Sequence, residues 1–102
     1  MEMSKMLTLS TAHVSEETGE WLNQQGLVIA RRFQDRNTET TTVFMGSHDD
    51  GWFVHAPTHY EMDHEYPRDL LTVIMFARQH YVEYLNFDAG AGEVDGLPTF
   101  EW

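Results

Sequence analysis

The alternation of apolar and polar residues predicts a strand and then a helix in the first quarter of the chain. Residues 6–10, Met-Leu-Thr-Leu-Ser, alternate as a half-buried strand does. Ser15 stands where a helix N-cap is expected, and two glutamates follow it in the first turn, where carboxylates interact favourably with the helix dipole. We predict a helix from about residue 16 to residue 25, ended by Gly26.

The middle of the chain has the pattern of strands joined by hairpins. Residues 27–34 place apolar side chains at alternate positions, and residues 40–47 and 51–57 are rich in the β-branched and aromatic residues that a pleated surface accommodates well. Asp50-Gly51, between the last two runs, is a hairpin signal. We therefore predict an antiparallel meander of three strands over residues 27–56.

The last third predicts a second helix and a closing strand. Pro67 suits the first turn of a helix, and apolar residues follow it at helical spacing, so we predict a helix over residues 67–80. Residues 82–88 alternate again and precede a glycine-rich turn. The final run, residues 95–102, is expected to be a short edge strand at most, because Pro98 cannot donate to a ladder.

These elements predict the fold class. Their order is strand, helix, three strands, helix and one or two strands. Short hairpin connections favour an antiparallel sheet of about five strands with both helices packed on one face, which is an α+β fold. At this length we expect a single domain over residues 1–102.

Charge is the strongest compositional feature. Seventeen Asp and Glu face six Lys and Arg, a formal net charge of −11 with histidine neutral. Direct binding of nucleic acid or of an anionic membrane surface is therefore disfavoured, because both depend on cationic side chains. Such a field favours association with a basic protein surface, although acidity also serves solubility alone.

The compartment is indicated by what the chain lacks. It contains no cysteine, which excludes disulfides and thiolate chemistry and fits a reducing environment. No stretch reaches the roughly 20 apolar residues of a membrane span, and the first residues are too polar for a secretory signal. We expect a cytoplasmic protein.

The charges are unevenly distributed along the chain. No Lys or Arg occurs between Arg36 and Arg68, nor after Arg78, whereas acidic residues continue through both stretches. Aromatic residues accompany them, and aromatics with carboxylates at the rim suit an interface for a basic partner. We expect Tyr60, Tyr66 and Trp102 at the surface, and predict that a partner is bound by Asp49, Asp50, Tyr60, Glu61, Asp63, Glu65, Tyr66, Glu93 and Asp95.

Three histidines in residues 55–66 raise an alternative, a metal site. His55, His59 and His64 are imidazole ligands of the kind that zinc prefers, and three of them with an open position form a known catalytic arrangement. The prolines at 57 and 67 indicate a loop, whereas convergence at this spacing is simplest on a helix. Exposed loop histidines beside carboxylates are the other interpretation.

Other catalytic patterns are weak. Ser10, Thr11 and His13 are neighbours, but no nucleophile elbow, phosphate-binding glycine loop or dinucleotide fingerprint is present. We expect neither enzymatic activity nor a cofactor. A structural or dimerising accessory role remains a further alternative.

Three stretches carry a resemblance to a known family. "LTLSTAHVSEETGEWL" near the start, "GWFVHAP" in the middle and "FDAGAGEVDGLPTFEW" at the end resemble a domain-of-unknown-function family of small proteins carried by phages, plasmids and other mobile elements. The motifs are Ser-Thr-Ala-His at 10–13 and Leu-Pro-Thr-Phe-Glu-Trp at 97–102. The resemblance implies a counter-defence inhibitor, including the DNA-mimic type that occupies the nucleic-acid channel of a restriction or CRISPR effector.

Overall fold

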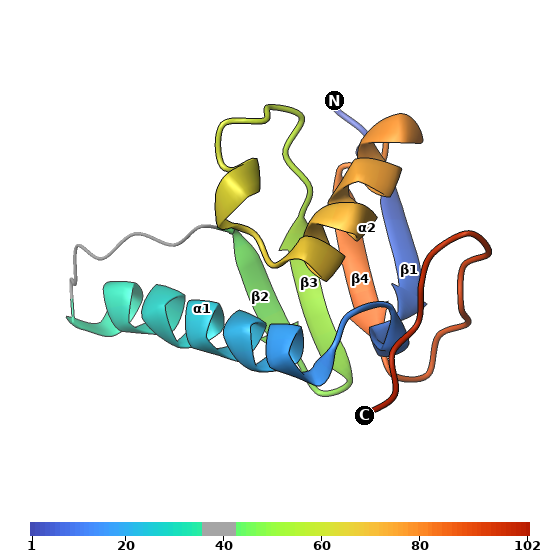
Figure 1. The fold of residues 1–102 in the computed structure, drawn as a ribbon. Coiled ribbons are helices and arrows are strands. Elements are labelled where there is room, and N and C mark those ends of the chain that lie inside the picture. Colours follow the sequence, from blue (N-terminus) through green and yellow to red (C-terminus); the bar gives the residue numbers. More distant parts are fainter. Residues whose placement is uncertain (36–42) are drawn as a thin grey trace.

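The structure is a computed structural model that describes the backbone of residues 1–35 and 43–102 and the side chains of residues 1–31 and 43–102. Figure 1 shows its helices and strands. The strands are β1 (Met6–Ser10), β2 (Met45–His48), β3 (Gly51–His55) and β4 (Tyr84–Asp88), and the helices are α1 (Glu16–Asp35) and α2 (Arg68–Gln79). Two single-turn 3₁₀ helices, η1 (Thr11–His13) and η2 (Asp63–Glu65), lie in the connections.

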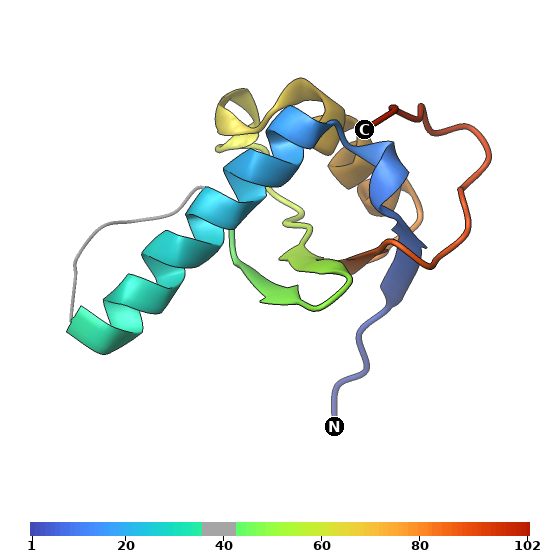
Figure 2. The ribbon, with the colours of Figure 1, turned by 90° about the horizontal axis from the view of Figure 1, so that it is seen from below.

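The four strands form one mixed sheet in the order β1-β4-β3-β2. β4 pairs antiparallel with β3 and parallel with β1, and β2 pairs antiparallel with β3. Both helices lie on the same face of this sheet (Figures 1 and 2). The predicted α+β class and the two helices are confirmed, whereas an antiparallel sheet of about five strands was wrong in its details. β1 and β4, the first and last strands along the chain, lie side by side in the sheet and run in the same direction.

The largest error concerns residues 27–34, which continue α1 and do not form a strand. Gly26 does not end the helix. A methyl group at Gly26 would lie 3.3 Å from Ser47 Oγ and 3.4 Å from Met45 Sδ, so this glycine allows α1 to pack closely on β2. Leu22 is buried and Ile29 packs against the same core seven residues later, a helical spacing. The predicted meander is therefore reduced to the hairpin of β2 and β3; residues 40–42 of the predicted second strand lie outside the described residues.

The other local predictions fared better. The first strand, the hairpin turn at Asp50-Gly51 and the second helix are confirmed within a residue or so at each end. The predicted edge strand over residues 95–102 was wrong, since residues 89–102 have no regular secondary structure. The backbone N–H of Phe100 instead donates to the carbonyl of Ala12 at 2.8 Å.

The core lies between the helices and the inward face of the sheet. Trp52 is buried and its neighbour Phe53 is 43% exposed, as expected for adjacent residues of a strand. The buried side chains of the sheet are Leu9, Met45, Trp52, Val54, Leu85 and Phe87, and those of the helices include Leu22, Leu70, Val73, Ile74 and Ala77. Within the described residues, no helix is long and apolar enough to cross a membrane.

Candidate interaction surface

Residues 57–66, here called the Arg78 loop, are arranged around the guanidinium of Arg78 from α2. Nε of Arg78 donates to the carbonyl of Pro57 at 2.7 Å, and Nη2 donates to the carbonyl of His59 at 2.8 Å. Both Nη atoms also donate to the carboxylate of Asp63, at 2.8 and 2.9 Å. The guanidinium lies 4.7 Å from the centre of the Tyr60 ring. A loop without a cation of its own is therefore organised by one from a helix.

This arrangement accounts for the charge state of Asp63. Its hydrogen bonds from Arg78 hold the pKa of the Asp63 carboxyl below its ordinary value, against burial, which raises it. The same hydrogen bonds raise the pKa of Arg78. The side chains of Arg78 and Asp63 are 9% and 23% exposed, so the ion pair is partly shielded from solvent. Asp63 was predicted to meet a partner, but its carboxylate is already paired within the chain.

The three histidines of the metal alternative come from the end of β3 (His55), from the irregular stretch after it (His59) and from η2 (His64). The His55 ring lies 5.3 Å from the Tyr84 ring on the face of the sheet away from the helices. His59 and His64 are exposed, the latter on η2. Among the described residues, no group of three His, Asp or Glu side chains is placed to hold a metal ion. The described geometry thus offers no support for the metal alternative.

Tyr66 was expected at the surface, and this was wrong because the side chain is 7% exposed and belongs to the core. Burial, which is the main cause, and the nearby carboxylates of Asp63 and Glu65 raise the pKa of Tyr66. Tyr60 and Trp102 are largely exposed, as predicted. Tyr66 sits directly before Pro67 and α2 and packs in the core, so little of its ring is left for a partner.

The remaining acidic residues of the prediction fall into two groups at opposite ends of the sheet. Glu61 and Glu65 lie in the Arg78 loop, which follows the last residue of β3. Asp49 and Asp50 form the turn before the first residue of β3, and the carbonyl of Asp50 accepts from Ala89 just after β4. Glu93 and Asp95 are exposed on the segment that leaves the sheet after β4 (Figure 1). One continuous surface over all nine residues is therefore not formed.

The carboxyl ends of β1 and β4 carry the denser acidic group. These strands are parallel, so Ser10 and Asp88 lie side by side, and Gly51 of β3 pairs with Asp88. The start of α1 and the β2–β3 turn are at this same end (Figure 1). We call it the acidic end and define it by Glu16, Glu17, Asp49, Asp50, Asp88, Glu93 and Asp95.

A cleft of about 390 Å³ opens at the acidic end between the β2–β3 turn and Trp102. Asp49 and Asp50 are at its border, and the rings of Trp52 and Trp102 are 6.3 Å apart at centre. Nε1 of Trp52 donates to Oδ1 of Asn23 at 2.9 Å, which directs the indole nitrogen toward α1. The cleft thus combines exposed carboxylates with aromatic surface.

His13 fastens residues 89–102, here called the C-terminal segment, to the start of the chain. Nδ1 of His13 lies 2.9 Å from the carbonyl oxygen of Pro98, which can only accept, so Nδ1 carries the proton. Nε2 then accepts from the backbone N–H of Val94 at 2.8 Å. The indole N–H of Trp102 donates to the carbonyl of Val14. The motifs at 10–13 and 97–102, far apart in sequence, therefore form one packed unit.

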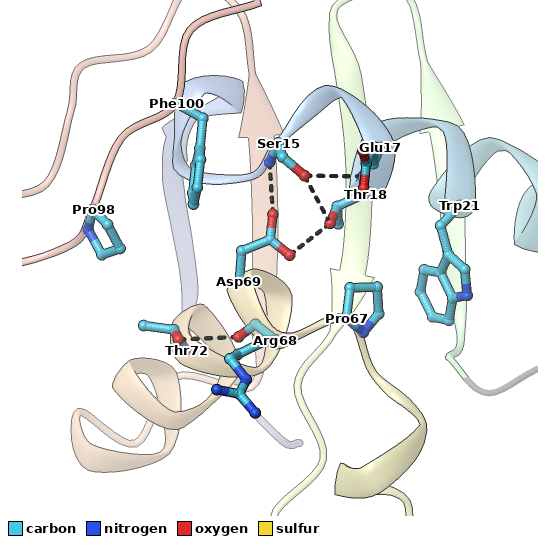
Figure 3. A pocket seen from close by; sticks show the side chains of 10 residues that line it. All are labelled: Ser15, Glu17, Thr18, Trp21, Pro67, Arg68, Asp69, Thr72, Pro98 and Phe100. Carbon is cyan, nitrogen blue, oxygen red and sulfur yellow. Dashed lines mark hydrogen bonds between the residues drawn. The ribbon is translucent and has the colours of Figure 1, made fainter.

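A pocket of about 590 Å³ lies where the starts of α1 and α2 approach the C-terminal segment (Figure 3). Asp69 dominates it. Its carboxylate accepts from the backbone N–H of Ser15 and from the hydroxyl of Thr18, each at 2.6 Å, and from the N–H of Leu70 at 3.0 Å. The Ser15 hydroxyl donates to Thr18 in turn. The Ser15 hydroxyl also accepts from the backbone N–H of Thr18 at 3.2 Å, so Ser15 is the N-cap of α1, and Asp69 joins this cap to the start of α2.

These bonds determine the ionisation of Asp69. Burial acts to raise the pKa of this carboxyl, but the hydrogen bonds from Thr18, Ser15 and Leu70 outweigh it and lower the pKa below its ordinary value. The hydroxyls of Ser15 and Thr18 and the carboxylate of Asp69 thus hold the start of α1 against the start of α2. The sequence identified Ser15 as a cap but did not reveal Asp69 and His13 as anchors. Asp69 binds Ser15, which is 54 residues away, and His13 binds Val94, which is 81 residues away, so neither contact appears as a local pattern.

Fold and surface together define a small, strongly acidic α+β domain with a mixed sheet, helices on one face and no catalytic constellation evident among the described side chains. The chain belongs to the DUF5983 family of unknown function, whose C-terminal domain model matches residues 6–102. No curated protein and no solved structure matches it. The family resemblance is thereby confirmed at the level of a domain of unknown function.

Proposed function

We propose that this chain is a non-enzymatic interaction protein of a mobile genetic element, and that its acidic end binds a basic surface of a host protein in the cytoplasm. The observation that carries the proposal is the charge: a net −11, with exposed carboxylates from three separate segments, and the half-buried Asp88, gathered at one end of the sheet. A field of this sign accelerates encounter with a basic surface and orients the two proteins.

The partner in this proposal is the nucleic-acid-binding surface of a host defence complex. Lys and Arg that bind phosphates also accept carboxylates, so an acidic protein with a rigid scaffold can occupy such a surface and exclude the nucleic acid. Rigidity is supported by the anchors at the acidic end, where the C-terminal segment is held by His13 and the start of α1 by Asp69. The mobile-element origin rests on the resemblance described above.

The test is affinity capture from the host at low salt, with the purified chain as bait. We expect a basic nucleic-acid-binding protein to be retained, and to be released steeply as salt rises, because exposed charges are screened within about 8 Å at physiological ionic strength. Added DNA should compete for the same partner. Capture of no such protein at low salt would contradict the proposal.

Two matched double variants locate the surface. Asp49→Asn with Asp50→Asn, and Glu61→Gln with Glu65→Gln, each remove two exposed negative charges, the first at the acidic end and the second in the Arg78 loop. We expect the first pair to reduce retention and the second to leave it nearly unchanged. Equal losses would show that net charge matters and that the acidic end is not a specific surface.

A further inference from the structure

The face of the sheet away from the helices exposes a band of apolar side chains. Phe44 is opposite His55 through the hydrogen bond from the His55 N–H to the Phe44 carbonyl at 2.9 Å, His55 pairs with Tyr84, and Tyr84 pairs with Met6. These four positions form one row across β1, β4, β3 and the residue that precedes β2. We call this side of the sheet the open face (Figure 2).

The exposure of this row is unusual for a protein surface. Phe44 is 73% exposed, Met6 54% and Tyr84 39%, and Phe53 stands beside them in the next row. Single exposed apolar residues need no explanation, but a contiguous group of large ones indicates a binding surface. A sheet that is apolar on both faces is usually covered on both, commonly by helices.

A hollow of about 290 Å³ lies within this band, bordered by Phe44, Phe53, His55 and Tyr84. Its floor is Gly46, which pairs with Phe53 and has no side chain to fill the space. A Cβ placed on Gly46 would meet no other atom within 4 Å. The hollow has the form of a socket for one apolar side chain of a bound molecule.

The charges around the open face indicate which kind of molecule it can bind. Asp49, Asp50 and Asp88 border one end of the open face and Glu83 the other, where Lys5 is a near neighbour. A second copy of this chain would bring another net charge of −11 to an acidic rim, which disfavours self-association through this face. An apolar surface with Lys and Arg at its edges is the complementary occupant.

We propose that the open face docks an amphipathic helix of a basic partner protein, with an apolar side chain of that helix seated over Gly46 and its Lys or Arg residues against the acidic rim. This inference rests on the proposed function, that a basic protein is bound, and adds the surface that provides apolar contacts. Docking of a helix in an apolar depression is a recurrent mode of recognition.

The probe is a synthetic 18-residue helical peptide with leucines on one face and lysines on the other. Two controls accompany it, one with glutamates in place of the lysines and one with serines in place of the leucines. Binding is followed by amide chemical shifts of the isotope-labelled chain. We expect the leucine-lysine peptide to shift residues 44–46, 53–55 and 84–86, and each control peptide to bind at least tenfold more weakly.

Gly46→Val separates docking from stability. Because the added side chain enters open space and valine suits a strand better than glycine, the variant should fold with unchanged or slightly higher stability. Filling the hollow should nevertheless weaken peptide binding roughly tenfold, the loss expected for a blocked central anchor. Phe44→Gln should act likewise, and Met75→Gln, an exposed apolar residue of α2, is the matched control with no effect.

The outcomes distinguish this inference from the function on which it rests. Shifts confined to residues 48–50 and 93–95, with Gly46→Val binding normally, would overturn the docking face and leave an acidic interaction protein. Shifts of the open face that depend on protein concentration without peptide, together with a dimer in sedimentation, would identify a second copy as the occupant and overturn the proposal. Absence of binding by any peptide at low salt would overturn the docking face alone, because affinity capture of a basic host protein tests the proposed function separately.

Discussion

The Arg78 loop and the β2–β3 turn are similar in sequence and opposite in what their carboxylates do. Each combines histidine with acidic residues in a connection at an end of β3. In the loop, Asp63 faces the guanidinium of Arg78 and holds the backbone in place. In the turn, Asp49 and Asp50 are exposed, and backbone groups of Asp50 make the contacts to His48 and Ala89. Asp63 thus serves the fold in the first region, whereas Asp49 and Asp50 both remain accessible in the second.

Among the substitutions that test this comparison, Arg78→Met is expected to have the largest effect on the free energy of unfolding. The carbonyls of Pro57 and His59 and the carboxylate of Asp63 would lose their donors together, and partly shielded groups without partners are costly. We expect a loss of about 2–3 kcal/mol in the free energy of unfolding, measured with urea, and faster amide exchange over residues 57–66.

Two further substitutions define the cause. Arg68→Met removes an exposed cation from the same helix and should change stability by less than about 0.5 kcal/mol. Arg78→Lys keeps the charge but cannot reproduce the bidentate contact with Asp63, so it should restore only part of the loss. Full recovery with lysine would show that charge alone holds the loop.

A smaller effect on stability is expected when the pH is lowered. Asp63 and Asp69 both have folded pKa values below their ordinary ones, through the Arg78 contact and through the hydrogen bonds at the start of α1 respectively. The stability that they contribute is therefore present above about pH 4 and lost as the pH falls through the folded values. Urea unfolding between pH 5.5 and pH 2.5 should show this decline, with shallower slopes for Asp63→Asn and Asp69→Asn. Curves parallel to that of the parent would contradict the assignment.

The smallest effect on stability is expected in the β2–β3 turn. Asp49→Asn with Asp50→Asn should change the free energy of unfolding by no more than about 0.5 kcal/mol, because both side chains are exposed and asparagine also suits turns. Urea unfolding measures this change. A loss as large as that of Arg78→Met would abolish the distinction between the two regions and assign the turn carboxylates a structural role.

Local patterns predicted several elements well and one badly. β1, the β2–β3 turn and α2 were predictable because alternation, Asp-Gly and Pro67 act over a few neighbouring residues. The second half of α1 was not, since apolar residues at 27 and 29 fit both a strand and a helix over so short a run. Gly26, interpreted as a helix end, instead lies within α1 where this helix packs closely on β2.

The candidate surface was predictable in composition and not in arrangement. Acidic, exposed Asp49, Asp50, Glu93 and Asp95 were identified from the sequence, and folding places them at or near one end of the sheet. Tyr66 and Asp63 were selected by the same criteria and are used inside the protein. Sequence proximity of opposite charges did not reveal the Asp63–Arg78 pair, since Arg78 is fifteen residues away on a helix.

The sequence by itself determined the sign and size of the charge, the absence of cysteine chemistry, the α+β class and the family, because these follow from composition, short-range periodicity and motifs. Only the tertiary structure decided that β1 lies parallel to β4, that His13 holds the C-terminal segment, that Arg78 organises the loop that carries His59 and His64, and that the described residues leave one face of the sheet uncovered. The physical reason is range: each of these contacts joins residues far apart in the chain, so its partners are chosen by packing and hydrogen bonding in the folded protein.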